Sequence, residues 1–275
     1  MKMKLYSKII IYTIILMFSV LYIFPFYWLI RSSFMTSAEI FAMPMRWLPK
    51  QFLWTNFSYS LTAFPFIVYL RNTLFIVILN IVGNIFASSF AAFGFARLDF
   101  PGKKFFFGLI ISTMMIPWAV LLIPSFIIWQ RLGFYDTYVP LTLPAFFMNA
   151  YYIFLVRQFI NTLPKDYDEA ARIDGAGYLS IYAKIILPLI IPALATVGVF
   201  SFMWSWNDFL GPLIYLRSSH NLTLALGLRQ FLAQYTNQWH YLMAASSVVI
   251  LPMILLYFFA QRYFIEGISF SGLKG

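Results

Sequence analysis

The feature that most constrains this chain is the spacing of its charged residues. Six long, predominantly apolar intervals without Asp, Glu, Lys or Arg can be distinguished, and they cover residues 9–30, 72–96, 105–130, 137–156, 185–207 and 230–261. A helix needs about 20 predominantly apolar residues to cross a bilayer, and each interval is long enough. Within lipid the backbone must satisfy its own hydrogen bonds, and the intervals lack the alternation of a barrel strand. The sequence therefore predicts an all-α integral membrane protein with six transmembrane helices.

The composition agrees with a membrane protein and argues against several kinds of active site. Hydrophobic residues make up 62% of the chain and charged residues 10%, against about 25% charged in soluble domains. The chain has no cysteine and two histidines, so we expect no metal site. It also lacks the G-x-x-x-x-G-K-[ST] loop that holds nucleotide phosphates. We therefore expect no catalytic residue, no cofactor on this chain and no enzyme activity.

We predict one transmembrane domain over residues 1–275. The expected helices cover roughly 9–31, 70–96, 105–130, 138–160, 186–212 and 241–263. Between them lie a first outer loop at 32–69, a loop at 164–187 and a last outer loop at 213–240, and a tail follows at 264–275. We expect the first helix to be retained, because its apolar run exceeds that of a signal peptide and no A-x-A-like cleavage site follows.

The distribution of basic residues predicts the orientation. With the N-terminus inside, twelve of the 19 Lys and Arg residues fall in inner segments and seven in outer ones. The positive-inside rule then places both termini in the cytoplasm. The net charge of +10 is explained by this bias and by contact with anionic lipid, so it does not indicate a nucleic-acid partner.

The predicted cytoplasmic loop between the fourth and fifth helices has an unusual composition. Its sequence PKDYDEAARIDGAGYLSIYAKIILP (residues 164–188) contains four of the nine acidic residues of the chain. Asp166 and Glu169 have the spacing of a capping box, and Gly175 stands where a left-handed C-terminal residue belongs. This predicts a short helix, followed by a second helix over 178–187. A helix so short is marginal alone, so we expect it to dock on another protein.

The exposed face of that short helix is expected to present small side chains, Ala170 and Ala171, with one larger residue, Ile173. Small side chains let another backbone approach closely, while Glu169 and Asp174 offer carboxylates to basic residues. An ordinary solvated loop is the alternative interpretation.

The spacing of the loop resembles the EAA loop of ABC importer permeases. It reads E-A-A, three residues, G, nine residues and I-x-L-P, at Glu169-Ala170-Ala171, Gly175, Ile185 and Leu187-Pro188. In that family the loop is a coupling helix that seats in the ATP-binding subunit. The resemblance implies the type I importer permease fold and the ATPase-coupling residues Glu169, Ala170, Ala171, Arg172, Asp174, Gly175, Ile185, Leu187 and Pro188.

Three further segments resemble the carbohydrate branch of that family, in particular the second permease subunit of maltose-type importers. They are FPFYWLIRSSFMTSAEIFAMPMRWLP (24–49), PALATVGVFSFMWSWNDFLGPLIY (192–215) and QRYFIEGISFSGLKG (261–275). The last departs from the family pattern around Ser269–Leu273, and the resemblance implies tail contacts to the ATPase at Gly272, Lys274 and Gly275.

The resemblance also implies partners, a substrate and a compartment. The partners are a sister permease forming a heterodimer, two ATP-binding subunits that hold ATP and Mg, and an extracytoplasmic solute-binding protein. The substrate is a carbohydrate, expected to be an oligosaccharide, moved by alternating access across a bacterial or archaeal cell membrane. Seven basic residues in the outer segments, against Glu39, Asp136 and Asp208, favour an acidic sugar, although topology alone produces the same excess.

The end of the fifth predicted helix supplies candidates for the translocation path. In WSWNDF, Asn207 and Asp208 are polar residues beside an apolar span, and Trp204 and Trp206 can stack on sugar rings. The alternative is that Asp208 caps the helix and pairs with Arg217 or Arg71, and that the tryptophans form an interfacial belt. An ion-coupled secondary sugar transporter remains the rival function. It needs intramembrane coupling acids, and Asp208 is the one candidate for that role.

Overall fold

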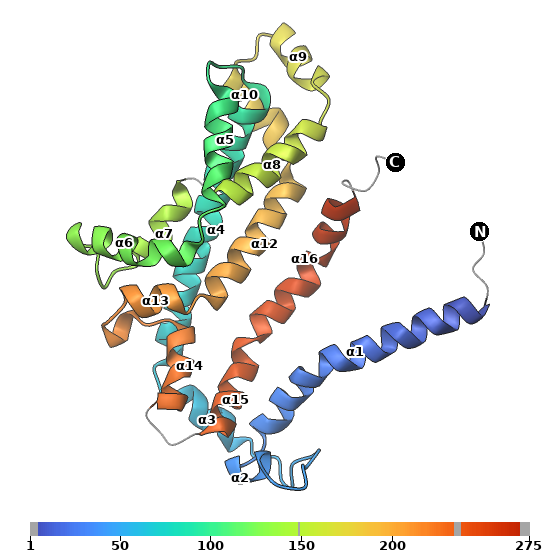
Figure 1. Cartoon of the computed structure of the whole chain (residues 1–275), viewed down its shortest axis with the longest axis vertical. Helices are drawn as coiled ribbons and strands as arrows, with labels where there is room; N and C mark the ends of the chain where they lie inside the picture. The colour runs from blue at the N-terminus through green and yellow to red at the C-terminus, as the bar shows by residue number, and fades with distance from the viewer. Residues whose placement is uncertain (1–4, 148, 234–237, 270–275) are drawn as a thin grey trace. The chain divides into compact units, whose positions relative to one another are not determined.

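A computed structural model describes residues 5–147, 149–233 and 238–269 of the chain, and every regular element within them is helical (Figure 1). In chain order they are α1 (Leu5–Ser33), α2 (Ser37–Ile40), α3 (Thr55–Thr62), α4 (Phe66–Arg97), α5 (Lys103–Thr113), α6 (Trp118–Arg131), α7 (Val139–Thr142), the 3-10 turn η1 (Leu143–Phe146), α8 (Ala150–Thr162), α9 (Asp166–Ile173), α10 (Tyr178–Ile181), the π-helical turn η2 (Tyr182–Ile186), α11 (Leu187–Leu189), α12 (Ile191–Asn207), α13 (Leu210–Tyr215), the 3-10 turn η3 (Ser219–Asn221), α14 (Leu224–Ala233), α15 (Trp239–Val249) and α16 (Leu251–Ser269).

The chain divides into two compact units. Unit 1 comprises residues up to Ile67 together with Leu226–Pro252, and unit 2 comprises Val68–Ala225 and the residues from Met253 onward. In unit 1, α15 packs against α1 and α3. Polar and aromatic contacts hold it there: the rings of Tyr59 and Tyr241 stack at 4.2 Å, and Ser37 Oγ lies 2.8 Å from His240 Nδ1.

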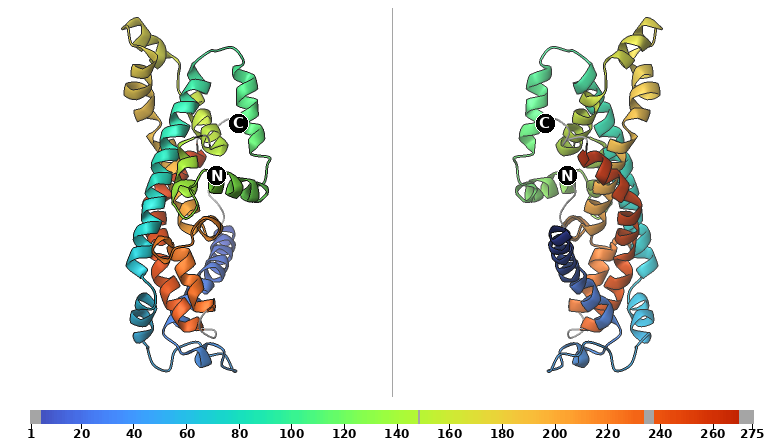
Figure 2. Two further views of the ribbon diagram at one scale, coloured as in Figure 1. Left: turned by 90° about the vertical axis from the view of Figure 1, so that its left-hand side faces the viewer. Right: turned by 90° about the vertical axis from the view of Figure 1, so that its right-hand side faces the viewer.

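Unit 2 is built around the long helix α4. Apolar side chains of α4, α8, α12 and the segment that enters α12 form its largest buried cluster, which includes Phe93, Val156, Ile186 and Val197. In Figures 1 and 2 the short helix α9 lies at one end of this unit, beside α10 and the C-terminal end of α4, and α13 lies well away from it.

Helices long and apolar enough to cross a membrane are found in each of the six predicted regions. Four qualify singly, at Leu5–Ser33, Phe66–Arg97, Val139–Thr162 and Trp239–Gln261, and two bent pairs bring the number to six if each pair is one span. The all-helical membrane fold that we predicted is thus confirmed, and its first two spans exceed the expected 9–31 and 70–96 by a few residues at their ends.

Two expected straight helices are instead bent. The region 105–130 contains α5 and α6 at 96°, and the fifth region contains Tyr178–Leu189 and Ile191–Asn207 at 74°. Proline explains both breaks, because it lacks an N–H and forces the preceding residue away from helical geometry. Pro117 caps α6, and Pro192 stands in the first turn of α12. The fifth region also ends at Asn207 rather than 212, since α13 begins separately at Leu210.

Candidate coupling helix and translocation cavity

The helix α9 is the structural form of the acid-rich loop. Three acidic residues, Asp166, Asp168 and Glu169, occupy its first turn, where negative charge stabilises the helix dipole. The capping box predicted at Asp166 is wrong, because the cap residue is Lys165 and its side chain makes no capping hydrogen bond. Asp166 lies one residue too far into the helix to accept from the first-turn N–H groups.

The predicted end of α9 is confirmed at Gly175. This glycine has φ 80°, its N–H donates to the Arg172 carbonyl at 3.0 Å, and the N–H of Ala176 donates to the Ala171 carbonyl at 2.9 Å. These two bonds form a Schellman motif, which stops the helix after two turns. The chain can therefore present α9 as a short, separate helix.

Most side chains of α9 face outward, as a docking surface requires. Glu169, Ala170, Arg172 and Asp174 are exposed, and Ile173 is 87% exposed. The expectation that Ala171 is also exposed is wrong, since it is buried in the core cluster of unit 2. With about 3.6 residues per turn, the helix cannot present both alanines to a partner while it rests on its own core.

Two of the remaining residues of the predicted coupling set pack against the core, and a third is exposed. Ile185 and Leu187 lie against the core cluster, and Pro188 is exposed in the first turn of α11. These three residues lie in the segment that joins α10 to α12. The predicted tail residues Gly272, Lys274 and Gly275 lie outside the described residues.

No sequence pattern indicates the contact that holds α9. Asp168 Oδ2 lies 2.6 Å from Arg97 Nε, at the C-terminal end of α4, and both side chains are nearly buried. Burial raises the pKa of Asp168, and the neighbouring guanidinium of Arg97 opposes that rise. The pair joins two segments that are far apart in the sequence, so no local pattern predicts it.

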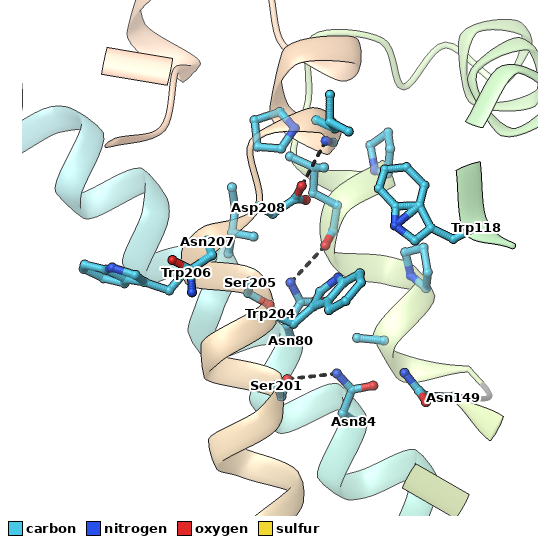
Figure 3. A pocket seen from close by; sticks show the side chains of 18 of the residues that line it. Asn80, Asn84, Trp118, Asn149, Ser201, Trp204, Ser205, Trp206, Asn207 and Asp208 are labelled. Carbon is cyan, nitrogen blue, oxygen red and sulfur yellow. Dashed lines mark hydrogen bonds between the residues drawn. The ribbon is translucent and has the colours of Figure 1, made fainter. Parts of the chain in front are cut away.

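A cavity of about 1320 Å³ lies in unit 2 between α4, α12 and the segment from α6 to α8. Its polar lining includes three asparagines, Asn80, Asn84 and Asn149, with the aromatic rings of Trp118 and Trp204 beside them (Figure 3). Asn80 Nδ2 donates to the Leu141 carbonyl at 3.0 Å, and Asn84 Nδ2 donates to Ser201 Oγ at 2.9 Å. Neutral amides and aromatic faces can bind a molecule that combines hydroxyl groups with an apolar ring surface.

All four predicted path residues line this cavity, but their side chains point in different directions. Trp204 is 65% exposed and projects into the space opposite Trp118, whereas Trp206 and Asn207 point away from it (Figure 3). Trp206 is buried and stacks on Phe202 at 5.3 Å, and Asn207 donates to the Met203 carbonyl at 2.7 Å.

Asp208 behaves partly as the alternative interpretation predicted. Its Oδ1 accepts a hydrogen bond at 3.0 Å from the N–H of Gly211 in the first turn of α13, although the N-cap residue of that helix is Phe209. The predicted ion pair with Arg217 or Arg71 is not among the contacts of the described residues. Asp208 therefore lines the cavity without a basic partner among the ion pairs of the described residues.

The asparagines and Trp118 are site residues that the sequence reasoning missed. Asn80 and Asn84 are four residues apart within an apolar helix, which puts both on one face. A polar pair at this spacing in a predicted span was the available signal, because polar groups inside membranes usually face protein or water.

Comparison with known proteins assigns the family. Residues 83–269 match the model of the "binding-protein-dependent transport system inner membrane component". The chain belongs to this family of permeases. The permease is 37% identical to the arabinooligosaccharides transport system permease protein of Halalkalibacterium halodurans, over 92% of this chain and 91% of that protein. It is 32% identical to the sn-glycerol-3-phosphate transport system permease protein of Brucella abortus (strain 2308), over 95% of this chain and 96% of that protein.

The structural comparison supports the fold of the permease. It superposes on a crystal structure of a bacterial ABC transporter involved in the import of the acidic polysaccharide alginate, with a TM-score of 0.82. The two chains are 24% identical, and the match covers 96% of this chain and 99% of the other. The permease therefore has the type I importer fold predicted from its loop.

Proposed function

We propose that this permease is one half of the membrane channel of an ATP-driven importer for a neutral oligosaccharide. It pairs with a sister permease, receives sugar from an extracytoplasmic binding protein, and docks through α9 on a separate ATPase that holds ATP and Mg. The termini lie in the cytoplasm. The observation that carries the proposal is that unit 2 contains both the mostly exposed E-A-A helix, which a Schellman motif ends at Gly175, and a cavity of sugar-binding character.

The lining of the cavity favours a neutral sugar over an acidic one. Asp208 is a carboxylate, and no Lys or Arg occurs among the residues that line the cavity in the described part of the chain. A uronate carboxylate entering here would meet a like charge without a basic partner, which is costly in a partly dehydrated site. Amide side chains satisfy hydroxyl donors and acceptors equally well. The excess of Lys and Arg over acidic residues in the predicted outer segments is then a consequence of membrane topology and not a sign of an acidic substrate.

Trp204 and Trp118 are suited to the apolar faces of sugar rings. Large aromatic surfaces bury much area at low entropic cost, and a pair on opposite walls can hold a ring between them. Trp206 cannot take this role, because its ring is buried against Phe202. It supports the helix that carries Trp204.

Uptake by the purified complex tests the proposal. The complex is isolated through a tag on this permease and reconstituted in liposomes with the binding protein. Accumulation of radiolabelled arabinotriose, maltotriose and an alginate trisaccharide is then measured with and without internal ATP. We expect ATP-dependent uptake of a neutral trisaccharide, unaffected by ionophores. Uptake that requires an ion gradient and no ATP refutes the importer, and preference for the alginate trisaccharide refutes the neutral substrate.

Paired tryptophan variants test the path. Trp204→Ala is expected to lower uptake about tenfold, equivalent to about 1.4 kcal/mol of lost stabilisation, with little change in thermal stability because the ring is mostly exposed. Trp206→Ala is the matched control and is expected to lower stability first, since a large buried side chain is removed. Equal uptake by Trp204→Ala and the wild type argues against the sugar contact.

A further inference from the structure

The short helix α9 has few attachments to its own chain. Leu163, which has an extended backbone, and Pro164 precede it, and the left-handed Gly175 follows shortly after it. Within α9 the side chains of Asp168 and Ala171 are buried, and the other described side chains of the helix are exposed. An eight-residue helix does not hold its position by itself, so these two contacts determine where α9 sits.

Arg97 supplies most of that attachment. Its Nε lies 2.6 Å from Asp168 Oδ2, and its second terminal nitrogen donates to the Leu163 carbonyl at 3.0 Å and to the Pro164 carbonyl at 3.4 Å. One guanidinium thus binds the segment that enters α9 and the first turn of α9 itself. The planar fork of arginine suits such multiple bonding, which a lysine ammonium cannot reproduce.

The Arg97–Asp168 pair is shielded from water, so the attraction between the two charges is only weakly screened. The Arg97 side chain is 5% exposed and that of Asp168 is 11% exposed. Neither Arg97 Nε nor the other oxygen of Asp168 makes a hydrogen bond among the described residues, so the contact between the two side chains is a buried ion pair. If Arg97 were removed, the carboxylate would be left buried and unpaired, and α9 would have to lift away from the core to hydrate it.

The same arginine is the last residue of α4, whose other end forms a wall of the cavity. Thr73, Ile76, Asn80 and Asn84 of α4 all line it. α4 is one unbroken helix, so Arg97 and Asn84 are joined by a rigid rod about 20 Å long. The other routes from α9 are less rigid: the one through α10 contains the π-helical turn η2 and the 74° bend, and the one through α8 passes extended residues.

We propose that the Arg97–Asp168 pair is the joint that transmits movement of the coupling helix to the cavity. When an ATPase displaces α9, the pair pulls the end of α4, and Asn80 and Asn84 move with it. Arg97 and Asp168 are positioning residues that touch neither nucleotide nor sugar. This inference rests on the proposed function, since it assumes that α9 is docked on an ATPase.

The test measures coupling separately from assembly. Arg97→Gln and Asp168→Asn are compared with Arg157→Gln, a matched control. Arg157 lies on α8 near the same end of unit 2, donates to the Phe95 carbonyl at 3.1 Å and stacks 4.0 Å from the Phe107 ring. For each complex we measure ATPase co-purification, ATP hydrolysis, and uptake of an equimolar mixture of arabinotriose, maltotriose and alginate trisaccharide. The exposed face of α9 is unchanged in all three, so ATPase co-purification is expected to match the wild type.

The decisive quantity is the amount of sugar moved per ATP hydrolysed. It is expected to fall at least tenfold in Arg97→Gln and in Asp168→Asn, and by less than twofold in Arg157→Gln. Because the chain contains no cysteine, the double variant Arg97→Cys/Asp168→Cys can be bridged within this chain by a short bismaleimide. The bridge is expected to restore the ratio, and a mock-treated sample is expected to remain uncoupled.

Each outcome separates the joint from the broader proposal. An unchanged ratio in both single variants overturns the joint. Loss of ATPase co-purification that the bridge does not repair shows that the pair has only a structural role, and this also overturns it. If wild-type complexes contain no ATPase or show no ATP-dependent uptake, the proposed function fails and the inference fails with it.

Discussion

Gly83 lies in the middle of α4, where the helix passes the turn η1 very closely. A Cβ added at this glycine would stand 2.8 Å from Phe146 Cδ2 and 3.0 Å from the carbonyl carbon of Ala145. Rotation of the Phe146 ring can relieve the first contact. The second involves backbone, so either η1 or α4 must shift. Such overpacking typically costs about 1–3 kcal/mol.

Alanine also stabilises a helix relative to glycine, by about 1 kcal/mol. For Gly83→Ala the two effects oppose each other, and we expect a net loss of up to about 2 kcal/mol. Gly94 supplies the control on the same helix, because a Cβ there meets no atom within 4 Å. We therefore expect Gly94→Ala to be stabilised by the full gain of about 1 kcal/mol that alanine gives over glycine in a helix. The difference between the two variants isolates the overpacking cost.

Thermal unfolding of the purified permease, followed by tryptophan fluorescence, measures this difference. A change of 1 kcal/mol moves the Tm of a chain of this size by about 2–4 °C, so Gly94→Ala should unfold roughly 2–12 °C above Gly83→Ala. Uptake should also fall in Gly83→Ala, because Ala145 and Asn84 beside the contact line the cavity. If Gly83→Ala is as stable as Gly94→Ala, the close approach of α4 and η1 is refuted.

Three other variants test single contacts. Asp136 accepts hydrogen bonds from Arg217 N–H at 2.8 Å and Ser218 N–H at 3.0 Å. Although burial raises its pKa, these bonds and the Ser218 hydroxyl hold the pKa well below the ordinary value. The stabilisation by the ionised Asp136 carboxylate is therefore present above about pH 4 and is lost as the pH falls further. The Tm difference between wild type and Asp136→Asn should accordingly narrow below about pH 4. A Tm difference that stays constant with pH would contradict a role for the carboxylate. Arg31 is buried with none of its guanidinium nitrogens hydrogen-bonded to a described residue, and it stacks 4.1 Å from Trp28. That contact is worth about 2 kcal/mol, against several for the desolvation of the guanidinium. We therefore expect Arg31→Met to raise the Tm, and a fall of several degrees would contradict this. Glu169→Lys changes an exposed residue and should alter stability by less than about 0.5 kcal/mol while abolishing ATPase co-purification; retained co-purification would argue against docking through α9.

The positions of the membrane helices could be predicted because charge exclusion from lipid is a local property of sequence. The bends could not be located from hydropathy, which records composition and not backbone geometry. Pro117 and Pro192 were nevertheless visible signals, since each removes a helical hydrogen bond within an uncharged interval. Proline alone does not locate the breaks, however, because Pro25 lies inside the continuous helix α1 and Pro124 inside α6.

Local capping rules gave mixed results for a physical reason. The end of α9 at Gly175 was predicted correctly, because a left-handed residue is a property of one position. The start was not, and a capping box of the same spacing forms instead at Thr36 and Glu39. Asp168, on the buried face of α9, forms an ion pair with Arg97 of α4, which is far away in the sequence. A long-range contact of this kind overrides a local capping pattern.

The cavity residues separate along helical periodicity that the sequence already contained. Trp204 faces the cavity and Trp206, two residues later on the same helix, lies on the opposite face, whereas Asn80 and Asn84 are four residues apart and share one face of α4. Asp208 follows the end of α12 and has an extended backbone, so this periodicity does not reach it. Treating WSWNDF as one functional group obscured this alternation. What the sequence could not show is that these two polar faces oppose each other across one space.

The Asn84–Ser201 hydrogen bond and the Arg97–Asp168 ion pair differ in strength, and this difference is consistent with a transport cycle. The Asn84–Ser201 hydrogen bond links α4 to α12 beside the cavity, and interhelical bonds of this kind contribute about 0.6 kcal/mol on average. Removal of one partner of the buried Arg97–Asp168 pair costs about 3–5 kcal/mol. A hydroxylated sugar can therefore replace the first contact at little cost, while the second persists as α4 moves. Variants at Asn84 should accordingly change sugar affinity before they change stability, whereas variants at Arg97 should change coupling at unaltered affinity.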